Sequence, residues 1–552
     1  MSSQGSVSRQ SKEEQDLYEM KKAAAEFYRV NRVPQEIERA LGQLLLLQPQ
    51  DLYGYLADYF TNLSAPPRIS RLKGREVYDA SGQLSIEAEV FCIVCNKEKS
   101  MSSAAVSSHS APMETSLDWK AKSQERVDHV VTAVQWINEP LNSMLKDQNP
   151  CAQSEIDHIL SSFFMARYLE EKTRNRENSC SPSQPEVVAP SPTPMQTKEK
   201  KNADKVKKSN MAEKPFVPAE PSEPVLHGSL AIGSLSLAVV KTGAQIQGIP
   251  LYKYIAALTG REAPTQFHIP ASLVTLLSCG KTSPGKLNLL KEVILIPKMG
   301  QGVKQAPQAV VCDSGAPTVS YERPEQPLDL ITEACSNLEL TLGTDIHLAV
   351  NCAAHELMDY SKGKYEVATG VLKSPDELAD MYQTLICKYP AVVALIDPFR
   401  REDADQWERL SKATGHTCSL ISDITYKSQA PPLPGVRGFI LKPVNETTVS
   451  DLICITSKHK GSVLMGTTSS EPCNEESLSD IAVGLGLDYV ILGGLSGAQR
   501  MLKYNRLISI EEELAQQGIL VSKEKHPPPL LHGKTQEQNR EDSLKEHSSQ
   551  PV

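Results

Sequence analysis

A lysine at the end of a short apolar run is the first residue here that could do chemistry. Residues 438–445 read Gly-Phe-Ile-Leu-Lys-Pro-Val-Asn, and Lys442 closes the apolar part. The run is too short for a helix and is typical of a buried parallel strand. In a barrel of such strands, groups at the C-terminal ends face the active site. The sequence therefore makes Lys442 the first candidate for a chemical role.

The residues after Lys442 repeat a regular alternation of elements. Apolar residues at helical spacing mark a helix over 447–456, and a second β run follows at 461–465. A helix at 478–485 and a third β run at 489–492 come next. Strands that alternate with helices in this way predict an α/β barrel.

Composition places the chain among globular proteins with room for more than one domain. It has 552 residues, 40% hydrophobic residues and a net charge of −9, so a basic surface for nucleic acid is not expected. We expect no membrane span and no signal peptide, and a cytoplasmic, reducing location. Of 12 cysteines, Cys92 and Cys95 form the one close pair. They lie in a predicted strand, 90–95, and we interpret them as ordinary buried thiols rather than a zinc or redox site.

Residues 12–64 form a separate helical unit. Three short amphipathic helices are predicted, and Pro34 stands at the start of the second, where its missing N–H is harmless. Helices this short cannot bury their apolar stripes alone, so self-association is expected. The phrase from Pro34 to Phe60 resembles the dimerisation-docking helices of the Dpy-30 and type II regulatory-subunit families. That resemblance implies a dimer that grips an amphipathic helix of a scaffold protein. The alternative is a helical cap that packs on its own barrel.

The end of the barrel region carries a specific phrase. Residues 441–445 read Leu-Lys-x-Val-Asn, and residues 500–514 read Arg-x-x-Lys-Tyr-Asn-Arg-Leu-x-x-Ile-Glu-Glu-Glu-Leu. Residues 75–88 resemble an opening hairpin, and residues 233–256 contain a Gly-Ile-Pro-Leu-Tyr turn. Together these stretches closely resemble enolases.

This resemblance implies a domain order. An enolase-type N-terminal α+β domain is expected at 69–266 and an α/β, TIM-like barrel at 267–514, both preceded by the helical dimerisation module. A Pro-, Ser- and Lys-rich segment at 174–224 is interpreted as a disordered insertion within the N-terminal domain, and 515–552 as a mostly disordered tail. The short stretch after Pro297 lacks a helical excursion that the family carries. A barrel without that helix would expose apolar surface or close differently, and a splice form is one explanation.

The resemblance also implies an activity. Enolases convert 2-phosphoglycerate to phosphoenolpyruvate and water in glycolysis, with a lysine base and magnesium ions that hold the charge of the intermediate. Lys442 matches the base, the proton acceptor, and Glu292 matches an active-site glutamate that binds substrate. The second lysine of the family falls at Ile491 or, with a small gap, at Gly493.

The three metal-ligand positions carry no charge in this sequence. They match Asn351, Ile396 and Ser422. Magnesium prefers carboxylate oxygens, so the substitutions argue against a bound ion. Asp397 and Asp423 are adjacent carboxylates, but a shift of one residue along a strand turns a side chain to the other face. We therefore expect them to be structural residues.

Further family positions are also substituted. The second active-site glutamate falls at Ser314, the loop histidine near Thr282 or Ser283, and the Ser-His-Arg-Ser phrase at 467–470. In the lid loop, His109 stands at a glycine position and Ala111 at that of a serine ligand.

Two functional hypotheses remain. The docking-type N-terminus and the Pro- and Lys-rich insertion resemble a divergent sperm branch of the family. This implies a place in the flagellum, on the fibrous sheath of the principal piece near other glycolytic enzymes, and a role in sperm motility. The chain is then either an enolase homologue, a hydro-lyase with weak or no activity, or a non-catalytic scaffold, a pseudoenzyme, and the residues favour the scaffold. A homodimer is expected in both cases.

Overall fold

The computed structural model describes most of the chain, in two compact units. The described residues are 12–107, 119–179, 225–260, 264–279, 285–297, 316, 320–425, 430–459, 463–468 and 471–521. The N-terminal unit comprises residues up to Pro67 together with Ile93–Glu98, and the main unit comprises the rest. Among the described helices, none combines the length and the apolar character needed to cross a membrane.

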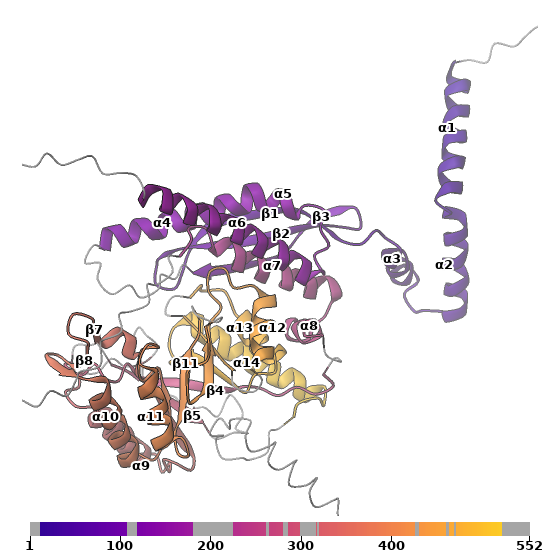
Figure 1. Ribbon diagram of the computed structural model, residues 1–552. Coiled ribbons are helices and arrows are strands. Elements are labelled where there is room, and N and C mark those ends of the chain that lie inside the picture. Colours follow the sequence, from indigo (N-terminus) through magenta and orange to yellow (C-terminus); the bar gives the residue numbers. More distant parts are fainter. Residues whose placement is uncertain are drawn as a thin grey trace, which may run out of the picture. The chain divides into compact units, whose positions relative to one another are not determined.

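Three helices form the described part of the N-terminal unit up to Asn62, and the sequence predicts three there. They are α1 (Lys12–Val30), α2 (Val33–Leu47) and α3 (Leu52–Asn62) (Figure 1). Pro34 lies in the first turn of α2, and the Asp51 side chain caps α3 by accepting a hydrogen bond of 2.8 Å from Gly54 N. Tyr55 Oη donates to Gln43 Oε1 across the α2–α3 hairpin. Of the described residues in these helices, Ala40 alone is buried.

The first part of the main unit is a sheet covered by helices. The sheet has the order β1 (Arg68–Tyr78), β2 (Leu84–Val94) and β3 (Lys97–Ser107). The helices are α4 (Trp119–Trp136), the π-helical turn Ile137–Leu141, α5 (Asn142–Leu145), α6 (Gln153–Ser179), α7 (Leu230–Gln247) and α8 (Leu251–Leu258). Pro140 lies inside the π turn, where its missing N–H accounts for the break in the regular helix.

The second part of the main unit is a closed barrel of eight strands. In chain order these are β4 (Ala271–Ser278), β5 (Glu292–Pro297), β6 (Ile346–Asn351), β10 (Val392–Ile396), β11 (Ser419–Asp423), β12 (Val436–Leu441), β13 (Val463–Gly466) and β14 (Tyr489–Gly493). Neighbouring strands are parallel except that β5 runs antiparallel to both β4 and β6. The end of the barrel that holds the C-terminal ends of the parallel strands therefore also holds the start of β5.

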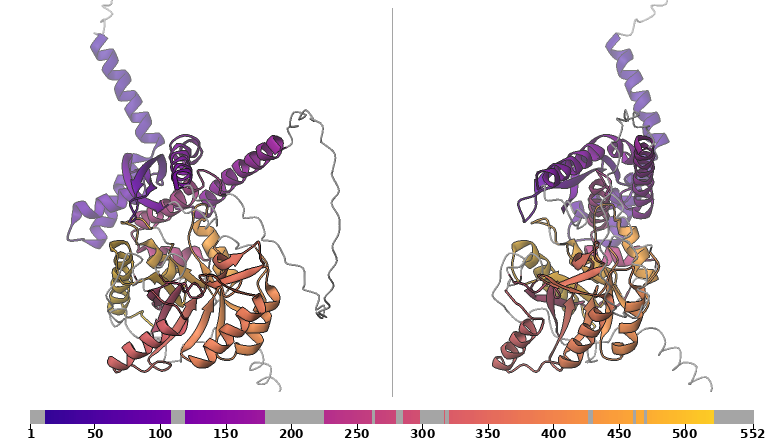
Figure 2. Two further views of the ribbon diagram at one scale, coloured as in Figure 1. Left: turned by 90° about the vertical axis from the view of Figure 1, so that its left-hand side faces the viewer. Right: turned by 60° about the vertical axis from the view of Figure 1, so that its left-hand side comes forward.

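Helices and a small sheet surround the barrel (Figures 1 and 2). The helices are α9 (Glu325–Asn337), α10 (Pro375–Lys388), α11 (Ala404–Thr414), α12 (Val449–Lys458), α13 (Ser477–Gly484) and α14 (Ala498–Gln516). A 3₁₀ turn at Ala354–Leu357 precedes the sheet of β7 (Met358–Asp359), β8 (Lys364–Ala368) and β9 (Val371–Lys373). Capping boxes at Ser374 and Thr448 start α10 and α12.

Polar contacts join the two parts of the main unit. Asp157 on α6 accepts hydrogen bonds from the backbone N and the Oγ of Ser450 on α12, at 3.0 and 2.6 Å. Gly233 N on α7 donates to the carbonyl oxygen of Asn445, at 2.9 Å. A Cβ at Gly233 would lie 2.4 Å from that oxygen, so this approach requires glycine.

The structure differs from the sequence prediction at several boundaries. Helix α6 continues to Ser179, so residues 174–179 are helical and not part of a disordered insertion. Helix α14 continues to Gln516, and Leu520 pairs with Phe267, so the structured region extends past Leu514. The rest of the predicted insertion and tail lies outside the described residues. The eight strands close although the stretch after Pro297 is short.

The predicted strand around the cysteine pair also ends earlier than expected. Strand β2 stops at Val94, and Cys95 occupies a turn with a positive φ of 51°. Cys92 is buried as expected, whereas Cys95 is exposed. Burial raises the pKa of the Cys92 thiol to about 12, so this thiol stays protonated and inert.

A buried ion pair next to the barrel gives a test of the fold. Arg400 and Asp403 are 3% and 8% exposed and make a two-point contact, with Nε–Oδ2 at 2.9 Å and Nη2–Oδ1 at 3.0 Å. Tyr365 Oη also donates to Asp403. We expect Asp403→Ala to lower the free energy of unfolding by about 3–5 kcal/mol, because it leaves a buried guanidinium without its carboxylate. Urea unfolding followed by tryptophan fluorescence measures this, since Trp407 is buried beside Phe399.

The matched control is Asp376→Ala, which breaks the exposed pair of Asp376 with Arg409. This variant should lose about 1 kcal/mol or less. Similar losses of unfolding free energy in the two variants would show that the buried Arg400–Asp403 pair stabilises the fold no more than an exposed pair does.

Candidate functional site at the barrel mouth

Strand alternation decides which side chains reach the barrel mouth. Ile396, Ile421 and Ile440 belong to the apolar cluster that fills the barrel interior. Side chains two residues apart on a strand share a face. The next inward position after Ile421 on β11 is therefore Asp423, and the next after Ile440 on β12 is Lys442.

Lys442 and Asp423 form an ion pair at the mouth. Lys442 Nζ lies 2.7 Å from Asp423 Oδ2, and both side chains are half-buried. Thr425 N donates to Asp423 Oδ1, while Lys442 N donates to Thr425 Oγ1. The prediction that Asp423 faces away from the site is therefore wrong, because the alternation brings its carboxylate to Lys442.

Asp397 lies directly beside this pair. It follows β10 in a left-handed conformation with φ of 45°, and its Oδ1 accepts a hydrogen bond from Asp423 N at 3.1 Å. Loss of contact with water and the charge of Asp423 raise the pKa of Asp397 to about 7. The two adjacent carboxylates are thus coupled to each other and to Lys442.

Ser422, the third position that matches a metal ligand of the family, does not face the mouth. It is 2% exposed, and alternation puts it on the same face as Leu420, which packs in the cluster between barrel and helices. The position that resembles a metal ligand therefore faces out of the barrel, and its neighbour Asp423 faces in.

Glu292 and Asn351 meet at the same mouth, on the strands that follow β10 around the barrel. They are paired residues of the antiparallel strands β5 and β6, and Asn351 Nδ2 donates to Glu292 Oε2 at 2.7 Å. Beside them, Lys291 Nζ lies 2.6 Å from Glu356 Oε1. The structure thus brings Glu292 and Asn351 into direct contact.

The residues at the mouth do not fit a magnesium ion. Ile396 is 2% exposed and puts hydrocarbon where the resemblance requires a carboxylate ligand. Asn351 directs its amide nitrogen at Glu292, and Asp423 is engaged by Lys442. Among the described residues, no group of three or more His, Cys, Asp or Glu side chains could hold a metal. Mg²⁺ needs near-octahedral oxygen ligands, which this arrangement does not supply.

The position of the second lysine is also apolar. Ile491 packs against the barrel-interior cluster, and Gly493 has a φ of 85° with its carbonyl oxygen facing Tyr504 Oη at 3.3 Å. Thr467 and Thr468 follow β13. His109, Ala111, Thr282, Ser283, Ser314, Ser469 and Ser470 lie outside the described residues.

The charge state of Lys442 decides what it can do. Burial lowers the pKa of Lys442, but the nearby carboxylates, Asp423 first, raise it more, and the pKa lies above its usual value. In turn, Lys442 more than offsets the effect of burial on Asp423 and holds the pKa of that carboxyl below its usual range. An ammonium held in this way cannot accept a proton at neutral pH.

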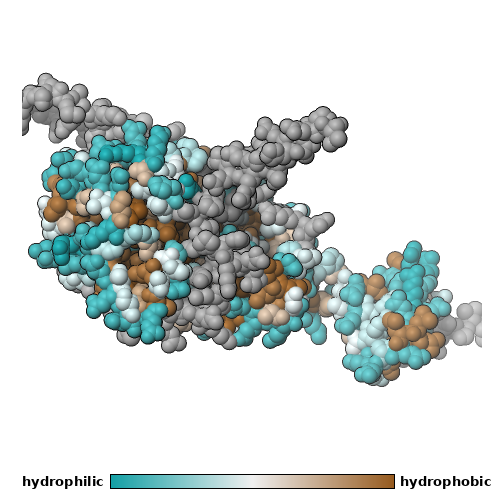
Figure 3. Space-filling model, turned by 90° about the horizontal axis from the view of Figure 1, so that it is seen from below, coloured by the Kyte–Doolittle hydropathy of each residue, from teal (hydrophilic) through white to brown (hydrophobic). Residues whose placement is uncertain are grey.

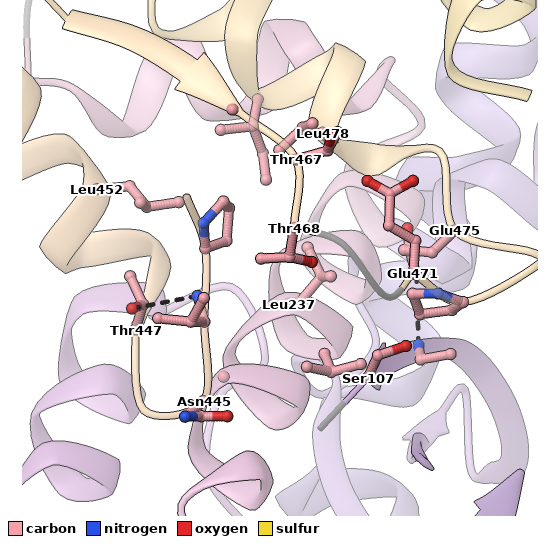
Figure 4. Close-up of a pocket in the computed structure, with 18 of the residues that line it drawn as sticks. Ser107, Leu237, Asn445, Thr447, Leu452, Thr467, Thr468, Glu471, Glu475 and Leu478 are labelled. Carbon is pink, nitrogen blue, oxygen red and sulfur yellow. Dashed lines mark hydrogen bonds between the residues drawn. The ribbon is translucent and has the colours of Figure 1, made fainter. Parts of the chain in front are cut away.

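A cavity of about 100 Å³ lies next to the mouth and was not found from the sequence (Figure 4). It contains the buried pair of Lys503 and Glu471, with Nζ–Oε2 at 3.0 Å and both side chains 5% exposed. Lys503 belongs to the closing phrase of the sequence, but its partner comes from a loop 32 residues earlier. No local pattern marks such a pair.

The eight-stranded barrel, its antiparallel β5 and the preceding α+β part define a protein of the enolase fold. The family described as "Enolase, C-terminal TIM barrel domain" matches residues 290–527. The chain is 43% identical to Enolase 4 of Danio rerio, over 95% of this chain and 96% of the relative. It is 42% identical to Enolase 4 of Xenopus laevis (94% and 95%) and 41% identical to that of Homo sapiens (93% and 91%). The chain belongs to the enolase family and is of the enolase 4 type.

Asp397 gives a prediction for the pH dependence of stability. Its folded pKa of about 7 lies above the unfolded value of about 3.9, so between these values the folded state binds more protons. The contribution of Asp397 to stability therefore falls as pH rises from about 4 to about 7. Asp397→Asn removes this loss and suits the left-handed backbone. In urea unfolding experiments across this pH range, the free energy of unfolding of the variant should increase relative to that of the wild type as pH rises.

The control is Leu330→Ala at an exposed leucine of α9, which changes no titratable group, so its difference from the wild type should stay flat over the same range. A flat difference for Asp397→Asn as well would mean that Asp397 titrates normally.

Proposed function

We propose that this chain is an enolase-fold scaffold that does not dehydrate 2-phosphoglycerate. The observation that carries the proposal is Ile396, an apolar side chain packed in the barrel interior at a metal-ligand position. The ion pair of Lys442 with Asp423 supports it, since it engages the residue that resembles the proton acceptor.

The chemistry itself explains why these changes matter. Removal of a proton next to a carboxylate creates a dianionic intermediate, and electrostatic stabilisation of that charge is usually the largest single contribution to such catalysis. At this mouth Asp423 already neutralises Lys442, and Glu292 adds a further carboxylate. A dianion would therefore meet repulsion where the reaction needs positive charge.

The docking function is proposed for the N-terminal unit. Ile37, Leu41 and Leu45 lie on one stripe of α2 and are 46%, 57% and 73% exposed. Figure 3 shows apolar surface on this unit, at the right. An apolar stripe of this kind favours pairing with a second copy, followed by binding of an amphipathic helix from a scaffold protein.

The cellular setting follows from the same features. We propose a place in the sperm flagellum, on the fibrous sheath of the principal piece, where other glycolytic enzymes would be neighbours. There an enolase-shaped body with docking helices would contribute to sperm motility through assembly and not through turnover. The support is the resemblance of the N-terminal unit to docking helices and the composition of the insertion.

Titration calorimetry tests the loss of chemistry. The full chain is titrated with 2-phosphoglycerate, with and without Mg²⁺, and phosphoenolpyruvate formation is followed by absorbance. We expect no magnesium-dependent heat and no product, because the mouth lacks the ligands for the ion. A catalytically active enolase measured in the same buffer is the positive control.

Magnesium-dependent heat with turnover would overturn the proposal and make the chain a hydro-lyase. In that case Lys442→Ala should abolish product formation, and Asp397 and Asp423 become the candidate ligands.

Hydrogen–deuterium exchange tests the docking unit in the full chain. We expect the amides of α2 to become more protected as protein concentration rises, because a second copy covers the stripe. Leu41→Asp with Leu45→Asp should remove that gain at every concentration, since burying two carboxylates at the interface is unfavourable. Leu330→Asp, at an exposed leucine of α9, is the matched control and should leave it intact.

This readout is independent of any dimer formed by the barrel, which is the usual state of enolase relatives. Protection of α2 that is strong at all concentrations would instead show that these helices pack within their own chain.

A further inference from the structure

Helix α1 carries an apolar stripe of its own. Leu17, Met20, Ala24 and Phe27 follow one another at spacings of three, four and three residues, so they share one side of the helix. Leu17, Met20 and Phe27 are 49%, 67% and 61% exposed, and Ala24 is half-buried. We call these four residues the α1 stripe. Within the part of the chain that the structure describes, no element buries it.

The other two helices of this unit are joined to each other. Tyr55 Oη donates to Gln43 Oε1 at 2.9 Å, and Tyr59 Oη donates to Glu36 Oε2 at 3.4 Å. Helix α3 therefore packs on α2, whereas α1 extends away from α3 (Figure 1). A helix of 19 residues gains most of its stability in water by packing an apolar face, so the α1 stripe calls for a partner from outside this unit.

The spacing indicates the kind of partner. A repeat of three and four residues is that of a left-handed coiled coil, in which side chains at the a and d positions of one helix insert between side chains of the other. Leu17 and Ala24 take the a positions of the α1 stripe, and Met20 and Phe27 take the d positions. Because Ala24 is small, a second helix can approach closely at the middle of the stripe. The stripe therefore fits the apolar face of another helix.

The charges beside the stripe fix the direction of that helix. Asp16 stands at the g position on one side and Lys21 at the e position on the other, and both are exposed. In a parallel pair a g residue faces the e residue five positions later in the second helix, so Asp16 of each copy would meet Lys21 of the other. In the antiparallel register that matches the same stripe, Lys21 would face Lys21 of the second copy and repel it. The charge pattern therefore favours a parallel pair.

The same charges identify the partner as a second copy of this chain. No acidic residue stands three or four positions from Lys21 in α1, because those positions hold Leu17, Tyr18, Ala24 and Ala25. A carboxylate for Lys21 is instead supplied by Asp16 of a second copy. One sequence thus carries both halves of the ion pair, as a symmetric, self-complementary interface requires.

We propose that α1 pairs in parallel and in register with α1 of a second copy, as a short two-stranded coiled coil. The α1 stripe forms its core, and Asp16 of each copy lies beside Lys21 of the other. This inference rests on the proposed docking function, because both require a second copy, and a paired α2 holds two α1 helices at a high effective concentration. It adds the relative direction of the two copies, which the stripe of α2 leaves open.

Disulfide formation in the full chain tests the arrangement. Leu17→Cys places a thiol in the α1 stripe, and diamide, which takes up the two thiol hydrogens, links thiols that meet. In a parallel pair the two introduced thiols face each other within disulfide reach, about 6 Å between Cα atoms. In an antiparallel pair they lie about 15 Å apart along the axis, at roughly 1.5 Å per residue. We expect the linked peptide to form, and its mass distinguishes it from links between native cysteines.

The matched control is Lys22→Cys, on the opposite side of α1. Its two thiols point away from the second helix, so it should form about tenfold less linked peptide or lower still. A variant with both Leu17→Cys and Phe27→Cys detects the antiparallel alternative, because only that arrangement links position 17 of one copy to position 27 of the other.

Exchange of the charges tests the ion pair. In the Leu17→Cys background, Lys21→Glu sets two carboxylates against each other on both sides of the pair and should lower the linked fraction several-fold. Adding Asp16→Lys restores opposite charges and should recover the linked fraction. This recovery requires that the two positions meet across the two copies.

The inference is overturned if Leu17→Cys forms no more linked peptide than Lys22→Cys, if positions 17 and 27 link instead, or if Asp16→Lys does not recover the link. Protection of the α2 amides, measured in the same samples, separates this result from the docking function. Loss of the link between the two positions 17 while α2 is still protected at high concentration refutes the pairing of α1 alone. Loss of both refutes the docking function as well.

Discussion

The closed barrel allows one side chain in two to point inward, and the other properties of the mouth depend on this constraint. On β10, β11 and β12 the inward positions hold Ile396, Ile421 and Ile440. The barrel interior is therefore filled with hydrocarbon up to the C-terminal ends of these strands. Charged groups can meet only above that layer. Asp423 and Lys442 occupy those positions, and their ion pair at 2.7 Å is the result. A closed sheet without edges holds this register, because a slip of one residue would bury both charges.

The same geometry explains why an ion pair and a divalent metal are alternatives at this mouth. A metal needs several carboxylates that converge on one point, and such carboxylates repel each other without the ion. Here one inward position is apolar, one is an amide, and the remaining carboxylate faces an ammonium. The charge of Asp423 is compensated by Lys442 from within the chain, so this carboxylate does not require a cation beside it. The pKa of Asp397 is raised first by burial and then by the charge of Asp423, and Lys442 offsets only part of these two effects.

Sequence patterns were sufficient for the elements and insufficient for the contacts. The run ending at Lys442 predicted a strand, and the helical spacing after it predicted α12, since period and length are local properties. The orientation of Asp423 was not predicted. Asp423 faces the same way as Ile421, two residues earlier on the strand, and only the closed barrel shows that Ile421 points inward. The pair of Lys503 with Glu471 and the cavity beside it depend on loops and helices that meet only in three dimensions. The exposed Cys95 follows from a tight turn that residue types alone did not mark.

The two units differ in how many of their large apolar side chains are buried. In the main unit, large apolar side chains fill continuous clusters inside the barrel and between barrel and helices, and these clusters are buried within the chain itself. In the three N-terminal helices, leucine and tyrosine side chains remain at the surface and Ala40 alone is buried among the described residues. Short helices gain most of their stability from packing, so this unit gains its fold from whatever covers it. Buried apolar clusters in the main unit and exposed apolar stripes on the N-terminal helices are the arrangement that the proposed docking role would require.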